Sequence, residues 1–471
     1  MASNTGFISQ ALLTTLFFAT AAALAQSPLA RAPHAAVQTV SPAGGHYSEP
    51  GIAINPKNPK QIVVVFQGGA QVQGVSSAAY SNDSGRTFTL AKGTKANDWK
   101  VGGDVSTAFD NKGHVFLCYM TFDRLGTAAY WAHDAGRNGI FVRRSDDGGK
   151  TWDKQAAALK EFATNHAPGI EFEDMPRIFA DTWSSSPYAG NLYVGWIEWQ
   201  LTQSIMVFSR STDAGKTWSA PMRISTHAGL PRDDNGSVGG IMMAIARDGT
   251  LYAIWHDGNS ITLAISHDGG KTFGASRPVI ETAPPYFGEV PGVSRVEGFP
   301  QIAADTRDPN KLYVCWSDYR NGDIDVFLAA SGDKGNTWSK PIRVNNDPIH
   351  NGKDQFYQWM TIDPVTNNLY VDFYDRRDDP KNMNTGVTLA RSTDGGRTFA
   401  NYAWADKAFD PGGAFLGDYT WSAAYNDRVY AAWTATPPKK PEPKGKKDGA
   451  HADKRPETVV VVGSADFSQA K

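Results

Sequence analysis

The sequence has few cysteines and no excess of charge of either sign. Only two of its 471 residues are cysteine, which excludes a disulfide scaffold and a zinc site made of four thiolates. The 46 basic and 48 acidic side chains give a formal net charge of -2, so the chain lacks the basic excess typical of proteins that bind phosphate backbones. We therefore expect no nucleic-acid partner.

Long apolar runs are also missing, except near the N-terminus. The mean hydropathy of -0.40 excludes a protein with several membrane spans. Residues 11–25 are apolar and end in Ala23-Leu24-Ala25, the small-x-small pattern of a signal-peptide cleavage site, although no Lys or Arg precedes them. This run is too short for a comfortable membrane span. We expect residues 1–25 to be a signal peptide of a secreted or periplasmic protein that does not span the membrane.

Glycine and proline, in contrast, are abundant. The 46 Gly and 27 Pro residues favour many tight turns over long helices. The apolar fraction of 41% is too high for a disordered chain. The composition therefore predicts a globular protein rich in turns.

One turn motif, S-x-D-x-G-x-T-[WF], occurs six times. The copies are residues 81–88, 145–152, 211–218, 266–273, 331–338 and 392–399. Within such a segment the Ser and Asp side chains can accept backbone N–H bonds, and the Gly supplies the left-handed position of a hairpin turn. Because the motif is complete as a turn, we expect its aspartates to be structural rather than catalytic or calcium-binding.

A second repeat is an apolar strand that lies upstream of each turn. It occurs seven times, once more than the turn motif. Its copies are residues 62–66, 115–119, 192–196, 251–255, 312–316, 369–373 and 429–433. Each follows another strand, so one unit consists of strands A, B and C, the turn and strand D. Regular repetition of such a unit predicts an all-β fold, a seven-bladed β-propeller of four-stranded antiparallel blades, with a six-bladed sialidase-type propeller as the alternative.

The seven units predict a single domain over residues 36–466, expected to be monomeric. The last unit lacks strand D, which residues 36–40 can supply, so that the two ends of the chain close the ring. Residues 437–456 are charged and rich in proline, and we interpret them as a disordered surface loop. Cys118 and Cys315 fall in strand B of the second and fifth units and are expected to be buried thiols.

The turn motif is the Asp box of the bacterial neuraminidase (BNR) repeats, and the chain resembles the sialidase (neuraminidase) superfamily over nearly all of its mature length. The resemblance implies a glycoside hydrolase in which three arginines bind the substrate carboxylate, a Tyr paired with a Glu is the nucleophile, and an Asp is the acid/base. Transferred by position, these roles fall on the following residues: Arg177, Arg320 and Arg376 for the carboxylate, Glu297 with Tyr419 for the nucleophile, and Asp104 for the acid/base. The chain departs from the family pattern at Tyr47–Pro50, where Arg-Ile-Pro is expected, and in having seven units instead of six.

Topology predicts which face carries the site. If the turns and the A–B loops share one face, the starts of strands A and the ends of strands B lie around a funnel on the other face. Residues there that the repeat itself does not require are the better functional candidates, and they include Glu49, Asp104, Arg177, Glu297 and Tyr419. Glu49 is expected to bind substrate, as is Asp174 on the same face. An acid also stands two residues after the strand B aromatic in four units, at Glu198, Asp257, Asp318 and Asp375. That recurring position is equally consistent with architecture and with function.

Three functions remain open at this point. The first is a sialidase-like hydrolase of the exo-alpha-sialidase type, acting on acidic terminal sugars. The second is another carbohydrate-active enzyme, either a two-carboxylate hydrolase or a polysaccharide lyase with His46, His133 or His256 as the base. The third is a non-catalytic propeller that binds carbohydrate or protein. A glycan is the expected partner; no cofactor is expected, and the Asp-rich loops would accept a structural calcium ion although no EF-hand-like loop is present.

Overall fold

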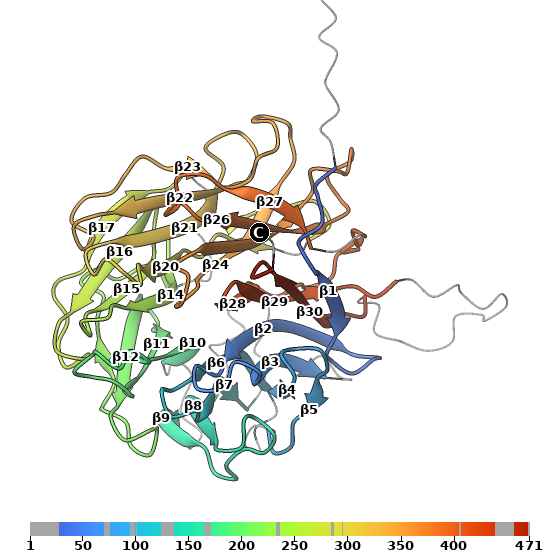
Figure 1. Cartoon of the computed structure of the whole chain (residues 1–471). Coiled ribbons are helices and arrows are strands. Elements are labelled where there is room, and N and C mark those ends of the chain that lie inside the picture. Colours follow the sequence, from blue (N-terminus) through green and yellow to red (C-terminus); the bar gives the residue numbers. More distant parts are fainter. Residues whose placement is uncertain are drawn as a thin grey trace, which may run out of the picture.

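Seven four-stranded antiparallel sheets surround a central axis (Figure 1). The computed structural model describes residues 28–69, 76–94, 99, 101–123, 136–163, 171–231, 236–283, 287–293, 295–404, 407–438 and 456–469. The expected signal peptide and most of the charged loop 437–456 lie outside these residues. Within them, no helix is long and apolar enough to cross a membrane.

The first four blades take their strands in chain order. Blade 1 consists of β2 (His46–Ile54), β3 (Ile62–Gly69), β4 (Ser77–Ser81) and β5 (Thr89–Leu90). Blade 2 consists of β6 (Val101–Phe109), β7 (Val115–Phe122), β8 (Asn138–Ser145) and β9 (Ala157–Phe162). Blade 3 consists of β10 (Phe172–Ala180), β11 (Leu192–Trp199), β12 (Ser204–Ser211) and β13 (Met222–Arg223). Blade 4 consists of β14 (Val238–Ile245), β15 (Leu251–Asp257), β16 (Ser260–Ser266) and β17 (Arg277–Glu281).

Blades 5 and 6 follow the same order after a small insertion. A two-stranded ribbon, β18 (Phe287–Gly288) and β19 (Val296–Glu297), precedes blade 5. Blade 5 consists of β20 (Gln301–Ala304), β21 (Leu312–Asp318), β22 (Asp325–Ser331) and β23 (Ile342–Arg343). Blade 6 consists of β24 (Gln355–Ile362), β25 (Leu369–Asp375), β26 (Gly386–Ser392) and β27 (Ala400–Ala403).

Blade 7 joins the two ends of the chain. It consists of β28 (Trp421–Tyr425), β29 (Arg428–Ala435), β30 (Val459–Asp466) and, as its outer strand, β1 (Ala36–Thr39). β1 lies beside β30 (Figure 1). Their pairing is antiparallel and brings Val37 opposite Gly463. The predicted seven-bladed ring and its closure by the N-terminal strand are therefore confirmed, and the six-bladed alternative is wrong.

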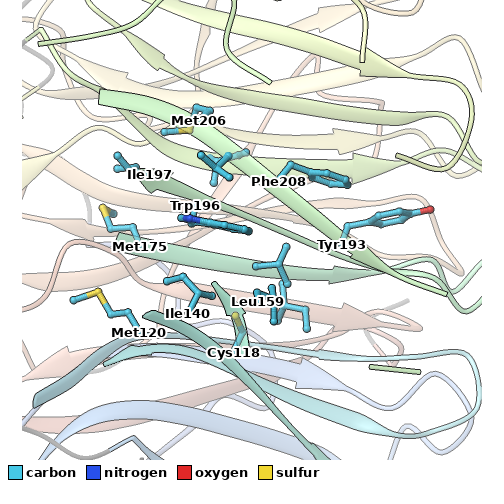
Figure 2. Close-up of a cluster of buried hydrophobic side chains, with 14 of the residues drawn as sticks. Cys118, Met120, Ile140, Leu159, Met175, Tyr193, Trp196, Ile197, Met206 and Phe208 are labelled. Atoms are coloured by element: carbon cyan, nitrogen blue, oxygen red, sulfur yellow. The ribbon is translucent and has the colours of Figure 1, made fainter. Parts of the chain in front are cut away.

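The hydrophobic core lies between neighbouring blades and is built on the second strand of each. Every residue of β7 and β11 is buried, because a strand in the middle of a blade is covered on both faces. Figure 2 shows one such layer, in which Cys118 and Ile140 of blade 2 face Trp196 and Phe208 of blade 3. Cys118 and Cys315 are both buried free thiols, as predicted.

The six repeated turns share one hydrogen-bond pattern. In the second copy, the Asp147 carboxylate accepts the backbone N–H of Thr151 at 3.0 Å and its hydroxyl at 2.6 Å. The Ser145 hydroxyl accepts the N–H of Gly149 at 3.0 Å and donates to Asp147 at 2.8 Å. Each repeated aspartate is thus occupied within its own turn.

Candidate functional site

A bulge interrupts the innermost strand of five blades. In each case two residues of the inner strand stand opposite one residue of the second strand, as at Glu49–Pro50, Asp104–Val105 and Tyr357–Gln358. Bulges re-aim side chains and often lie beside active sites. The single residue opposite is the large aromatic of the second strand in all five blades, and these residues are Phe66, Tyr119, Trp196, Trp255 and Phe373.

The first bulge residue has a left-handed backbone. Its φ is 52° at Glu49, 47° at Asp104, 52° at Met175 and 50° at Tyr357, and only the fourth blade places a glycine there, Gly240. Residues other than glycine adopt this conformation at a cost of about 1–3 kcal/mol. The fold therefore holds Glu49 and Asp104 in a conformation that tertiary packing must impose.

Glu49 and Asp104 belong to a cluster of charged side chains at the axis. The electrostatic neighbours of Glu49 are Asp104, Asp418, Arg295 and Arg177. These residues come from blades 1, 2, 3 and 7 and from the ribbon before blade 5, so they meet only at the axis of the ring. We call this set, together with Asp174, Glu297 and Tyr419, the axial cluster.

Burial raises the pKa of both bulge carboxyls. It raises the pKa of Glu49 well above its usual range; the charges of Asp104 and Asp418 add to the rise, and Arg295 and Arg177 oppose it. Burial likewise raises the pKa of Asp104 to about 6, against the lowering influence of Arg177. One Glu49 oxygen, Oε2, is buried and makes no hydrogen bond to any described residue.

Two neighbours position the pair. The Gln67 side chain of β3 accepts the backbone N–H of Asp104 at 3.0 Å and donates to the Ser48 hydroxyl at 3.2 Å, so it connects the two bulges. Gly417 packs directly on Glu49: a Cβ at this glycine would lie 2.5 Å from Glu49 Cγ.

An ion pair stands beside the bulge carboxyls. Arg295 Nε donates to Asp418 at 2.7 Å, and a second guanidinium nitrogen contacts the other Asp418 oxygen. The same Nε lies 3.4 Å from Glu297 Oε1. The Tyr357 hydroxyl donates to the Arg295 carbonyl at 2.7 Å. Arg295 has 28% of its side chain exposed, whereas the carboxylates of Asp418 and Glu297 are buried.

Arg177 forms the floor of the cluster. Its guanidinium carbon lies 3.8 Å from the centre of the Tyr419 ring and 5.7 Å from that of Trp421. Trp421 in turn stacks on Trp359 at 4.0 Å. Beyond these rings lies an axial cavity of about 320 Å³, lined mainly by apolar residues of all seven inner strands, Ile52 and Phe179 among them. Arg177 and the aromatic rings thus lie between the charged cluster and this apolar cavity.

Tyr419 and Glu297 have different neighbours from those that the resemblance implies. The charged neighbours of Tyr419 are Arg177, Glu49 and Asp104, and its hydroxyl donates to the Val105 carbonyl at 3.3 Å. Burial raises its pKa well above 10, which disfavours a tyrosinate nucleophile. Glu297 pairs with Arg295 instead.

Asp174 lies at the edge of the cluster. One of its oxygens accepts the indole N–H of Trp199 at 2.9 Å, and the other accepts the backbone N–H of Met175 at 3.0 Å. Its side chain also forms a hydrogen bond with Asp104 that lowers the Asp104 pKa. Asp174 therefore supports the acidic pair from blade 3.

Arg320 and Arg376 bind local partners outside the axial cluster. Arg320 binds Asp318 through Nε at 2.8 Å, donates to the Glu281 carbonyl, and lies over the Phe327 ring. Arg376 is buried and donates to the carbonyls of Pro291 at 2.8 Å and Asn382 at 2.6 Å. Both guanidiniums bind neighbouring loops, so the structure does not bring Arg320 and Arg376 into the axial cluster with Arg177, as the expected carboxylate site requires.

Three of the four recurring acids that follow strand B have local cations. Glu198 binds Lys160 at 2.6 Å, Asp318 binds Arg320, and Asp375 binds Arg377 at 2.5 Å. These three acids are thus paired with cations within a blade or between blades. Lys160 also lies 3.2 Å from Glu173, whose pKa burial raises to about 8.

Two of the three histidines that could serve a lyase, His46 and His256, have described partners outside the axial cluster. His256 is buried, which lowers its pKa to about 3, and its neighbours are Thr282 and Asp318. His46 contacts the Pro456 carbonyl, and His133 lies outside the described residues. Within the described part of the chain, no three His, Cys, Asp or Glu side chains are arranged to hold a metal ion.

Arg295 and Gln67 were not anticipated from the sequence. Arg295 lies two residues before Glu297 in the insertion that precedes blade 5, outside the repeat from which the candidates were chosen. Gln67 directly follows the strand B aromatic Phe66, opposite the first bulge. The polar side chain of Gln67, directly after the apolar strand, is the feature of the sequence that could have indicated its role.

Comparison with known proteins gives similarity at low identity only. No protein-family model and no curated protein matches the chain. Similar solved structures include the Hadza microbial sialidase Hz136, at 16% identity and a TM-score of 0.46 over 70% of this chain and 64% of that one. They also include the alpha-L-arabinofuranosidase Arb93A from Fusarium graminearum (12% identity, TM-score 0.46, 78% and 93% covered) and a polysaccharide lyase PL25, an ulvan lyase (12%, 0.49, 83% and 92%). By their names, two of these neighbours are glycosidases and the third is a polysaccharide lyase.

Proposed function

We propose that the protein hydrolyses glycosidic bonds with the carboxyl pair Glu49 and Asp104. The observation that carries this proposal is the placement of the two groups on consecutive bulges at the axis, both with raised pKa values. Glycoside hydrolysis needs one carboxylic acid that keeps its proton and one carboxylate beside it. Environments that separate the pKa values of two neighbouring carboxyls assign these roles.

Glu49 is the proposed general acid. Above about pH 6 Asp104 loses its proton, and the resulting charge further disfavours ionisation of Glu49. Glu49 would then donate its proton to the glycosidic oxygen as the C–O bond breaks. Asp104 would stabilise the positive charge on the sugar ring, either by attacking it or by activating water, and water completes the hydrolysis.

The sialidase-type reaction on an acidic terminal sugar is the narrower form of this proposal. Arg177 and Arg295 in the axial cluster favour it, because guanidiniums bind a carboxylate. Against it, the cluster has five carboxyl groups, from Glu49, Asp104, Asp174, Glu297 and Asp418, for these two guanidiniums. Such a surplus of carboxyl groups disfavours binding of a substrate that carries its own carboxylate. We therefore propose sugars without a carboxylate as the preferred substrates.

A panel of fluorogenic glycosides tests the proposal. It should include neutral sugars, a uronide and a sialoside, with wild type compared with Glu49→Gln and Asp104→Asn. We expect turnover of at least one glycoside and a loss of roughly 10²- to 10⁴-fold in each variant. Asp372→Asn, which changes a buried carboxyl between blades 6 and 7, is the matched control and should keep activity.

Two results would contradict the hydrolase. One is the absence of turnover for every glycoside by a protein that is folded by circular dichroism. The other is an ultraviolet-absorbing unsaturated product from a uronate polymer, which would indicate elimination in place of hydrolysis.

A further inference from the structure

Phe415 is the one exposed aromatic residue among those whose side chains the structure describes. Its side chain is 38% exposed, while the other aromatic rings are buried or partly buried. Single exposed apolar residues are ordinary on protein surfaces, so what distinguishes Phe415 is its position beside the axial cluster.

The loop presents this ring rigidly. Ala414 and Leu416, on either side, are buried in the core of blades 6 and 7. The Gly413 N–H donates to the Gly292 carbonyl at 3.0 Å, and Gly417 packs on Glu49. Phe415 therefore points outward from a segment that is anchored before and after it.

The ring also borders the axial cluster. The guanidinium carbon of Arg295 lies 5.5 Å from the centre of the Phe415 ring, while the same guanidinium binds Asp418. Only two residues separate Phe415 from Asp418 along the chain. The exposed ring is thus next to the most exposed charged group of the cluster.

We propose that Phe415 and Arg295 form a platform for a sugar ring next to the bond that is cut. This inference deepens the proposed function and rests on it. An aromatic face packs on the C–H face of a pyranose, while the guanidinium donates to its hydroxyl groups. An oligosaccharide would reach the acidic pair with one unit at Glu49 and Asp104 and a neighbouring unit on Phe415.

Binding to an array of neutral and acidic oligosaccharides tests the platform directly. The fluorescently labelled proteins are wild type, Phe415→Ala and Phe415→Tyr, each also in the Glu49→Gln background to prevent cleavage. Ile349→Ala is the matched control, because Ile349 is 55% exposed on a loop of the same face. We expect Phe415→Ala to weaken binding roughly 2- to 10-fold, and Phe415→Tyr and Ile349→Ala to bind like wild type.

Equal binding by Phe415→Ala and wild type overturns the platform, and so does an array on which wild type binds nothing. The two proposals fail separately. Binding that depends on Phe415 without any turnover would reject the hydrolase and keep the platform. Turnover of an oligosaccharide with the same KM in Phe415→Ala would reject the platform and keep the hydrolase.

Discussion

The guanidinium carbon of Arg177 lies 3.8 Å from the centre of the Tyr419 ring, and its charge acts on the carboxyls of Glu49 and Asp104. It is buried and makes a hydrogen bond to the Pro176 carbonyl. In this position Arg177 serves as a fixed counter-charge to the two acids rather than as an exposed binding group for substrate. Its charge lowers the pKa of both carboxyls.

Replacing Arg177 should therefore move the pH dependence of hydrolysis. In Arg177→Met the pKa of Asp104 should rise further above about 6, since the lowering influence is gone. The acid limb of the kcat/KM profile should shift to higher pH by about one unit. Arg320→Met removes an arginine bound outside the cluster and should leave the profile in place; a profile that is unchanged in Arg177→Met would reject the counter-charge role.

Gly417→Ala should displace Glu49. The glycine has a φ of 87°, and its new Cβ would lie 2.5 Å from Glu49 Cγ and 2.9 Å from Glu49 N. Gly352→Ala is the control, because its φ is 69° and nothing lies within 4 Å of its Cβ. Both changes should cost roughly 1 kcal/mol or more of stability from backbone strain. Glycoside hydrolysis should fall at least about 10-fold in Gly417→Ala alone, and equal activity in the two variants would contradict the contact.

Asp372 should make stability fall with rising pH. Burial raises its pKa to about 7 from an ordinary value of 3.8, although the hydroxyls of Ser422 and Thr420 oppose the rise. The folded state therefore holds this proton more tightly than the unfolded state. The resulting stabilisation is complete below about pH 3.8 and is lost as the pH rises to 7, at up to about 1.4 kcal/mol for each pH unit.

Chemical unfolding at pH 4.5, 6 and 7.5 measures this effect. Asp372→Asn should be more stable than wild type at pH 7.5 and should gain progressively less as the pH falls. Asp394→Asn is the control, because hydrogen bonds within its turn lower the Asp394 pKa to about 2. Its effect on the free energy of unfolding should therefore be constant between pH 4.5 and 7.5. A constant difference between Asp372→Asn and wild type would show that Asp372 is ionised in the folded protein.

The repeated turns should matter for stability and not for catalysis. Asp147→Ala removes the acceptor of the Lys150 and Thr151 backbone N–H groups, each at 3.0 Å. A loss of about 1–2 kcal/mol is expected, as for other side chains that cap backbone N–H groups. Hydrolysis should be unchanged because the turn lies on the face opposite the axial cluster. A selective loss of activity at full stability would give this aspartate a functional role.

Much of the fold could be predicted because its signals are local. The Ser, Asp, Gly and Thr of each turn satisfy one another within eight residues, and the apolar strands recur at a fixed place before them. Even the closure of the ring followed from counting strands, since the last unit lacked one that residues 36–40 could provide.

The site could be predicted only in part. Glu49, Asp104, Asp174, Arg177, Glu297 and Tyr419 were selected by their place at the starts of inner strands, and the structure brings them to the axis. Arg320 and Arg376 occupy equivalent places after second strands but bind local partners. Position in the repeat shows which face a side chain is on, but not which neighbour it binds.

The sequence by itself therefore determined the number of blades, their turns and the face on which the polar residues gather. Only the tertiary structure decided that Glu49 and Asp104 share a buried environment with Arg177 and Arg295. The physical reason is that these groups come from different blades, and their directions depend on bulges with left-handed backbones that neighbouring blades hold in place. The charge of each carboxyl is then set by burial and by partners far away in the chain, which no local pattern encodes.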